Sequence, residues 1–127
     1  MILSINHIQL VAEKNLVIQL RDFYCDIVGL TQGFRPAFER FGFWLYIGKK
    51  DVLHLITPKE GDERSSRKSS FDHIAFKASN YKDVLQKLES LHIPFEEKPI
   101  PGMSAHQIFL RDPAGNRVEL NFDGDTN

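Results

Sequence analysis

The chain has 127 residues, enough for one compact domain with a hydrophobic core. Its 42% hydrophobic and 26% charged residues are typical of globular proteins, and a net charge of −1 argues against nucleic acid or an anionic membrane as a partner. No apolar run reaches the roughly 20 residues that span a bilayer, the N-terminus lacks the features of a signal peptide, and a single cysteine excludes an internal disulfide, so we expect a cytoplasmic protein.

The first half of the chain predicts a strand, a helix and three further strands. Residues 3–12 form the first strand, and a helix follows over about 16–28, with Asn15 as its cap and Gly29 as its left-handed end. Residues 31–35 predict a short strand, and a hairpin of strands 41–47 and 52–57 closes the half. Residues 58–70 are rich in serine and charge and predict a linker.

The second half repeats that order. It predicts a strand over 71–79, a helix capped by Asn80 that runs to about residue 91, and strands over 94–98, 105–111 and 117–122. The last two strands flank a turn at 112–116, where proline and glycine suit a turn. The sequence therefore predicts an α+β fold of two tandem βαβββ modules in a single domain, with module 1 over about 1–57 and module 2 over about 71–123.

Four polar residues occupy matching places in the two halves. His7 and His54 are 47 residues apart (54 − 7), and His73 and Glu119 are 46 apart (119 − 73). Strand alternation places all four on the face opposite the helices, and polar groups buried there are costly unless they bind a partner. A divalent metal ion (Zn, Ni, Fe, Co or Mn) is a suitable partner, because neutral imidazole and carboxylate are suitable ligands for it. We expect His54, either a fourth ligand or a nearby base, and Glu119 to be catalytic.

Further side chains share the face of these four. By the same alternation we expect Gln9, Gln107, Phe109 and Asn121 to contact a substrate, together with Trp44 from the aromatic strand before His54. An aromatic cavity wall favours an apolar or aromatic organic substrate. His106 has the opposite parity and is expected to face the helices or the end of the strand.

The sequence resembles the vicinal oxygen chelate superfamily, which includes glyoxalase I, extradiol dioxygenases and fosfomycin- and bleomycin-resistance proteins. Four segments carry the resemblance: 7–10, 23–30, 72–76 and, most specifically, 109–120. It implies a curled mixed sheet around a metal-binding cavity, with ligands from the first and last strand of each module. Those positions match His7, His54, His73 and Glu119.

The resemblance implies a divalent-metal-dependent enzyme that binds a small organic substrate by bidentate oxygen chelation, as a glyoxalase-like lyase or isomerase or as a dioxygenase. His54 stands where glyoxalase I members usually have glutamate, which puts that activity in doubt. Fosfomycin-resistance members add a cationic pocket that the sequence does not identify.

The alternative is a non-catalytic protein that binds and sequesters a small molecule, as bleomycin-resistance members do, although those members lack the metal ligands. A third possibility is a degenerate scaffold without metal. By resemblance we expect a homodimer, with the site closed either within one chain or across the dimer.

Overall fold

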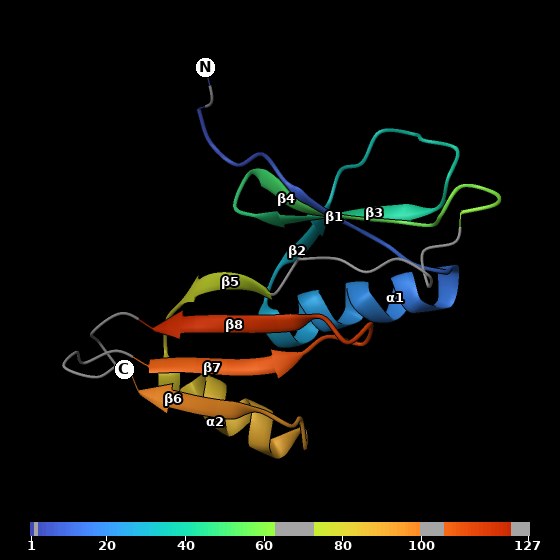
Figure 1. Cartoon of the computed structure of the whole chain (residues 1–127). Coiled ribbons are helices and arrows are strands. Elements are labelled where there is room, and N and C mark those ends of the chain that lie inside the picture. Colours follow the sequence, from blue (N-terminus) through green and yellow to red (C-terminus); the bar gives the residue numbers. More distant parts are fainter. Residues whose placement is uncertain (2, 63–72, 100–105, 123–127) are drawn as a thin grey trace. The chain divides into compact units, whose positions relative to one another are not determined.

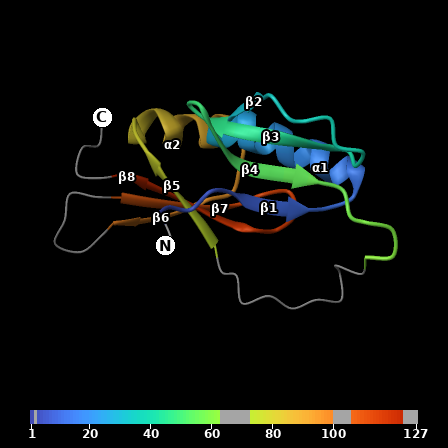
Figure 2. The same cartoon turned by 90° about the horizontal axis from the view of Figure 1, so that it is seen from above.

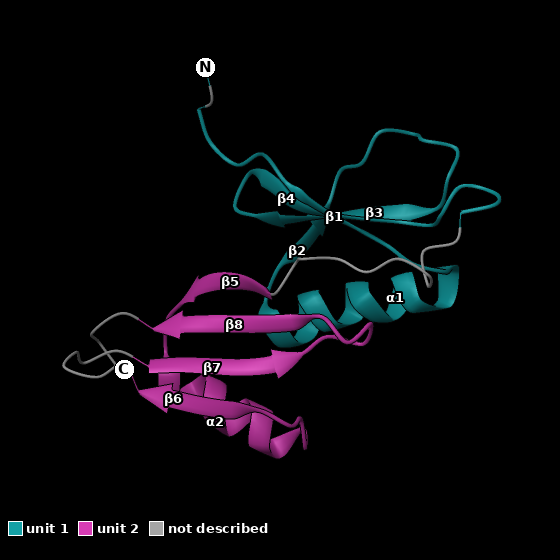
Figure 3. Ribbon diagram, in the orientation of Figure 1, with its two compact units in different colours: residues 1–69 teal, residues 70–127 magenta. Residues whose placement is uncertain are grey.

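The computed structural model describes residues 1, 3–62, 73–99 and 106–122. It divides the chain into two compact units, Met1–Ser69 and Ser70–Asn127 (Figure 3). Each unit contains a strand, a helix and three further strands in that order, so the prediction of an α+β fold with two tandem βαβββ modules is confirmed.

Unit 1 is a four-stranded mixed sheet with one helical segment. Its elements are β1 (Ile8–Val11), α1 (Lys14–Asp22), η1 (Phe23–Val28), β2 (Thr31–Gly33), β3 (Gly42–Ile47) and β4 (Lys50–Ile56). The strand order is β1-β4-β3-β2, and β1 runs parallel to β4, as Figure 2 shows. Helix α1 packs on β3 and β4, where Val17, Leu20, Leu45 and Leu55 are fully buried, so one face of this sheet belongs to the core.

Unit 2 repeats this topology. Its elements are β5 (His73–Ala78), α2 (Tyr81–Ser90), β6 (Glu96–Pro99), β7 (His106–Arg111) and β8 (Arg117–Phe122). The order is β5-β8-β7-β6, and β5 and β8 point the same way while β7 runs against them (Figure 1). In β8, Val118, Leu120 and Phe122 are buried in the core, so Glu119 faces the other side, as predicted.

The first strand is shorter than the predicted span of 3–12. Pairing between β1 and β4 covers Ile8 to Val11 only, opposite Leu53 to Ile56. A strand exists only where a neighbouring strand pairs with it, and β4 pairs with β1 only from Leu53 onward. His7 therefore directly precedes β1 rather than lying in it.

The predicted side-chain caps are wrong at both helices. The first helix begins at Lys14 with Glu13 as its N-cap, because the N–H of Val17 already donates to the Glu13 carbonyl. Burial of Val17 and Leu20 outweighs the roughly 1 kcal/mol that a good cap contributes. Asn80 does stand at the N-cap of α2, but its φ of 61° is left-handed and its side chain makes no capping hydrogen bond.

Other elements lie within a few residues of their predicted ends. The first helical segment ends at Val28, as predicted, but its last part, Phe23–Val28, is π-helical. Gly29 ends it with a φ of 105°. The single-domain assignment and the linker at 58–70 stay predictions, because much of that segment lies outside the described residues. Within the part of the chain that the structure describes, no helix is long and apolar enough to cross a membrane.

Candidate metal and substrate site

Unit 1 stacks three aromatic rings that the sequence analysis had singled out. The His7 and His54 rings lie 3.8 Å apart between centroids and 12° from parallel. Trp44, which pairs with His54 across β3 and β4, stacks on the His54 ring at 4.1 Å and 8°. His54, the middle ring, is buried, whereas Trp44 on one side of it is half-buried and His7 on the other side is exposed.

A bulge in β4 adds an acid that the sequence analysis missed. Leu45 pairs with Leu53 but Tyr46 pairs with Asp51, which leaves Val52 as an extra residue. Strict alternation would place Asp51 and His54 on opposite faces, and the extra residue places them on the same one. Their side chains then meet, with 2.6 Å between Asp51 Oδ2 and His54 Nε2.

This contact fixes the chemistry of His54. A carboxylate accepts hydrogen bonds only, so Nε2 carries the proton, and the lone pair of the neutral ring sits on Nδ1. The hydrogen bond from His54 holds the pKa of Asp51 below its ordinary value. Asp51 therefore stays ionised and keeps the His54 ring in one orientation.

His7 has the opposite arrangement. Its Nδ1 lies 2.8 Å from Oδ1 of Asn6, an amide oxygen that accepts a hydrogen bond. The lone pair of the neutral His7 ring is then on Nε2. Metal-binding histidines usually donate their other ring N–H to an oxygen in this way, so His7 has the form of a ligand.

Unit 2 brings its predicted pair together. His73 Nε2 lies 3.5 Å from Glu119 Oε1, and the Glu119 side chain is buried. The other carboxylate oxygen, Oε2, faces the side-chain amides of Gln107 at 3.4 Å and Asn121 at 3.3 Å. These amides hold the carboxylate with Oε1 directed toward His73. The buried Oδ1 of Asn121 has no hydrogen-bond partner among the described residues, as suits an atom that awaits a ligand.

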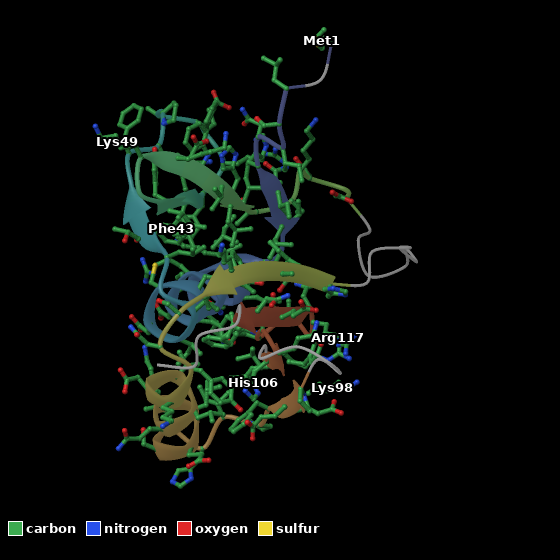
Figure 4. The ribbon with its side chains drawn as sticks, turned by 90° about the vertical axis from the view of Figure 1, so that its left-hand side faces the viewer. Met1, Phe43, Lys49, Lys98, His106 and Arg117 are labelled. Carbon is green, nitrogen blue, oxygen red and sulfur yellow. The ribbon has the colours of Figure 1, made fainter. Side chains whose placement is uncertain are left out.

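Phe109 lies beside this pair. It faces Glu119 across β7 and β8, and its ring meets His73 edge-on at 6.4 Å between centroids. The ammonium of Lys98 and the guanidinium of Arg117 both lie over the ring, at 5.3 and 4.1 Å from its centroid; Figure 4 labels these two residues. His106, by contrast, stacks on Tyr81 of α2, which confirms that it faces the helix.

The donor atoms fit a divalent metal ion in part. Two ligand atoms, each roughly 2.0–2.2 Å from one tetrahedral ion, lie about 3.4 Å apart, close to the separation of His73 and Glu119. His7 and His54 do not fit together, because a metal lies near the plane of each imidazole it binds and these planes are nearly parallel. Within neither unit do three histidine, cysteine or acidic side chains of the described residues gather as a metal cluster.

Unit 1 also contains a cavity of about 730 Å³. His7, Gln9, Trp44 and His54 line it, so four residues predicted from the sequence share one cavity wall. Arg35, Arg40 and Lys59 line it too, and no sequence signal singled these out. They lie outside the strands that carried the pattern, and only the folded chain brings them to the cavity that His7 also lines.

Comparison with protein families decides the assignment. The model of the glyoxalase/bleomycin resistance protein/dioxygenase superfamily matches residues 4–120. The chain belongs to this superfamily. A sequence search of curated proteins finds no significant match.

Solved structures of the superfamily share the fold. A Bacillus anthracis protein assigned to the glyoxalase family is 22% identical, with a TM-score of 0.73 over 97% of both chains. Lactoylglutathione lyase from Agrobacterium tumefaciens is 21% identical, with a TM-score of 0.65 over 94% of this chain and 92% of that one.

A third structure contains ligands. It is a variant of the fosfomycin resistance protein FosX from Listeria monocytogenes, in complex with Mn(II) and 1S,2S-dihydroxypropylphosphonic acid. It is 16% identical, with a TM-score of 0.71 over 97% of this chain and 94% of that one. The family model over residues 4–120 confirms the expected superfamily, and this FosX variant, which shares the fold, binds Mn(II) and a small organic molecule.

Proposed function

We propose that the protein is a divalent-metal-dependent enzyme that acts on a small organic substrate through two of the substrate's oxygen atoms. His7, His73 and Glu119 are the proposed ligands, and His54 is the proposed catalytic base rather than a fourth ligand. The observation that carries the proposal is the pair of His73 and Glu119, which are 3.5 Å apart with the carboxylate oriented by Gln107 and Asn121.

Each of these side chains has a separate task. A bound divalent ion would act as a Lewis acid toward the substrate oxygens. Gln107 and Asn121 keep Glu119 oriented, as hydrogen-bond partners of metal ligands generally do. Asp51 keeps the His54 ring fixed with its lone pair on Nδ1, the atom that would take and return a substrate proton. Trp44 stacks on His54 and limits its rotation.

Substrate contacts follow from the same placement. Gln9 and Trp44 line the same cavity as His7, and the buried Oδ1 of Asn121 is without a hydrogen-bond partner among the described residues. Phe109 presents its ring beside His73. We propose these residues, with Gln107, as the substrate-binding set of a cytoplasmic homodimer.

Metal content and oxygen uptake together test the reaction type. Protein purified without added metal is analysed for bound metals and then assayed with catechols in an oxygen electrode. Iron or manganese with oxygen uptake supports dioxygenase chemistry, whereas nickel, zinc or cobalt without uptake supports a lyase or isomerase. Metal-free protein that does not take up any of these ions on titration would contradict the proposal.

His54 is tested by a comparison of two substitutions. Asp51→Asn and Gln32→Glu each change one charge in unit 1, but only Asp51 contacts His54. We expect Asp51→Asn to lower kcat by about 10- to 100-fold, because it perturbs the orientation of the base and hence proton transfer. Equal kcat values for both variants and the wild type would show that the contact of Asp51 with His54 has no part in the mechanism.

A further inference from the structure

The cavity of unit 1 has a cationic side. Its lining includes three cations, Arg35, Arg40 and Lys59, and two acids, Glu39 and Asp51. Asp51 is already hydrogen-bonded to His54. In the described part of the chain, no ion pair joins any of the three cations to a carboxylate. Among the described residues, the positive charge on this wall is therefore not neutralised by an ion pair with a carboxylate.

Arg35 shows this most clearly. Its Nη2 donates to the Arg40 carbonyl at 3.0 Å, and its guanidinium lies 5.1 Å over the Phe38 ring. Its Nε is buried and has no hydrogen-bond acceptor among the described residues. A buried donor without an acceptor is costly, and charged donors cost most, so this atom needs an oxygen from elsewhere.

Another part of the wall is apolar and aromatic. Phe38 lies against Trp44, with 6.1 Å between ring centroids, and Leu55 and Ile56 complete this side. At Arg40 and Lys59 the cavity adjoins a second one of about 500 Å³, which these residues also line. The first cavity alone has the size of pockets that hold small organic ligands.

We propose that this cavity binds a small organic anion, with a carboxylate or phosphonate at Arg35, Arg40 and Lys59 and an apolar or aromatic body against Phe38 and Trp44. Because His7 lines the same cavity, the anion is the end of the substrate that lies away from the reacting oxygens. Only the position of the anion relative to the reacting oxygens rests on the proposed function. The anion site itself needs no metal.

Fluorescence of Trp44 measures binding directly, because Trp44 is the only tryptophan in the chain. Full-length protein is treated with a chelator and titrated with benzoate, phenylphosphonate or uncharged benzyl alcohol at low salt. We expect at least one of the two anions to change the fluorescence saturably and to bind about tenfold more tightly than the alcohol, because a charge-assisted hydrogen bond is worth about that factor. The anion that binds more tightly identifies carboxylate or phosphonate as the preferred group.

Substitutions locate the site. Arg40→Gln and Lys59→Gln should each weaken binding of the anion by about 3- to 10-fold and leave the alcohol unchanged. Lys49→Gln is the matched control: it removes the same charge from unit 1 but lies in the β3–β4 turn, outside the cavity lining (Figure 4). Arg35 is not used alone, since its bond to Arg40 also holds the loop.

Equal affinities for benzyl alcohol and both anions would overturn the assignment, as would equal losses from Lys49→Gln and Lys59→Gln. Since the chelator is present throughout, such a failure would leave the metal proposal standing. Conversely, a failure of metal binding would leave this anion site in place.

Discussion

The β7–β8 turn depends on one buried carboxylate. Asp112 is 4% exposed, and its Oδ1 accepts the N–H groups of Ala114 and Asn116, both at 2.9 Å. Its Oδ2 accepts the side-chain amide of Asn116 at 2.8 Å. At about 1 kcal/mol for each bond, Asp112→Ala should lower the free energy of unfolding by about 3 kcal/mol.

Asp112→Asn separates this account from a general loss of packing. The asparagine keeps Oδ1 for the two backbone N–H groups and loses only the acceptor at Oδ2, so we expect a loss of about 1 kcal/mol. Asp83→Ala, an exposed acid in the first turn of α2, serves as the control, with an expected loss of about 0.5 kcal/mol.

Urea unfolding followed by far-ultraviolet circular dichroism measures all three variants, provided that the m-value is unchanged. Equal losses for the alanine and asparagine variants would contradict the assignment of most of the stabilisation to the two backbone hydrogen bonds at Oδ1. The result matters for the site, because this turn joins the strands whose pairing puts Phe109 opposite Glu119.

Two further predictions concern unit 1 and unit 2 separately. An added Cβ at Gly42 would lie 2.2 Å from the Leu55 carbonyl oxygen, so Gly42→Ala should lower the free energy of unfolding by about 3 kcal/mol. The control Gly48→Ala, at a φ of 59° with open space around it, should lower it by about 1 kcal/mol. Similar losses of the two variants in urea unfolding would refute the close packing at Gly42. Burial and a hydrogen bond to Glu97 raise the pKa of Tyr81 to about 12. Its contribution to stability is therefore complete below about pH 10 and lost as the pH rises through 12, and an ultraviolet titration should show a late tyrosine transition that disappears in Tyr81→Phe.

Strand periodicity predicted the second unit well. The bounds of β8 match the prediction, and Glu119 faces away from the buried Val118 and Leu120 as alternation requires. Both the turn residue Asp112 and the helix-facing His106 also lie where the pattern places them. Local patterns sufficed here because the ladder of β5, β7 and β8 is regular.

Irregular structure limited the prediction in the first unit. The extra residue Val52 reverses the alternation, so that Asp51, assigned from the sequence to a turn, contacts His54. No pattern of residue types reveals such a bulge, since it depends on pairing with β3. The prediction for His7 assumed a strand that begins five residues too early.

The cationic wall could not be predicted for a different reason. Arg35 and Arg40 lie in a loop between β2 and β3, where no periodicity assigns a side chain to a face. Only tertiary contacts, such as that of Arg35 with the Arg40 carbonyl, place them at the cavity. The sequence therefore predicted the polar residues on regular strands and missed those on loops.

Isothermal titration of metal-free protein with Mn(II), Ni(II) and Zn(II) tests the central claim most directly. At least one ion should bind at one equivalent per chain, and Glu119→Gln should weaken it by more than about 100-fold, since loss even of a ligand's hydrogen-bond partner costs 10- to 100-fold. Two controls should bind the ion as tightly as the wild type does. They are Glu89→Gln, which changes an exposed acid on α2, and His92→Asn, because asparagine suits the left-handed φ of 55° at that position. Unchanged affinity in Glu119→Gln and His73→Asn would contradict the proposed ligand set.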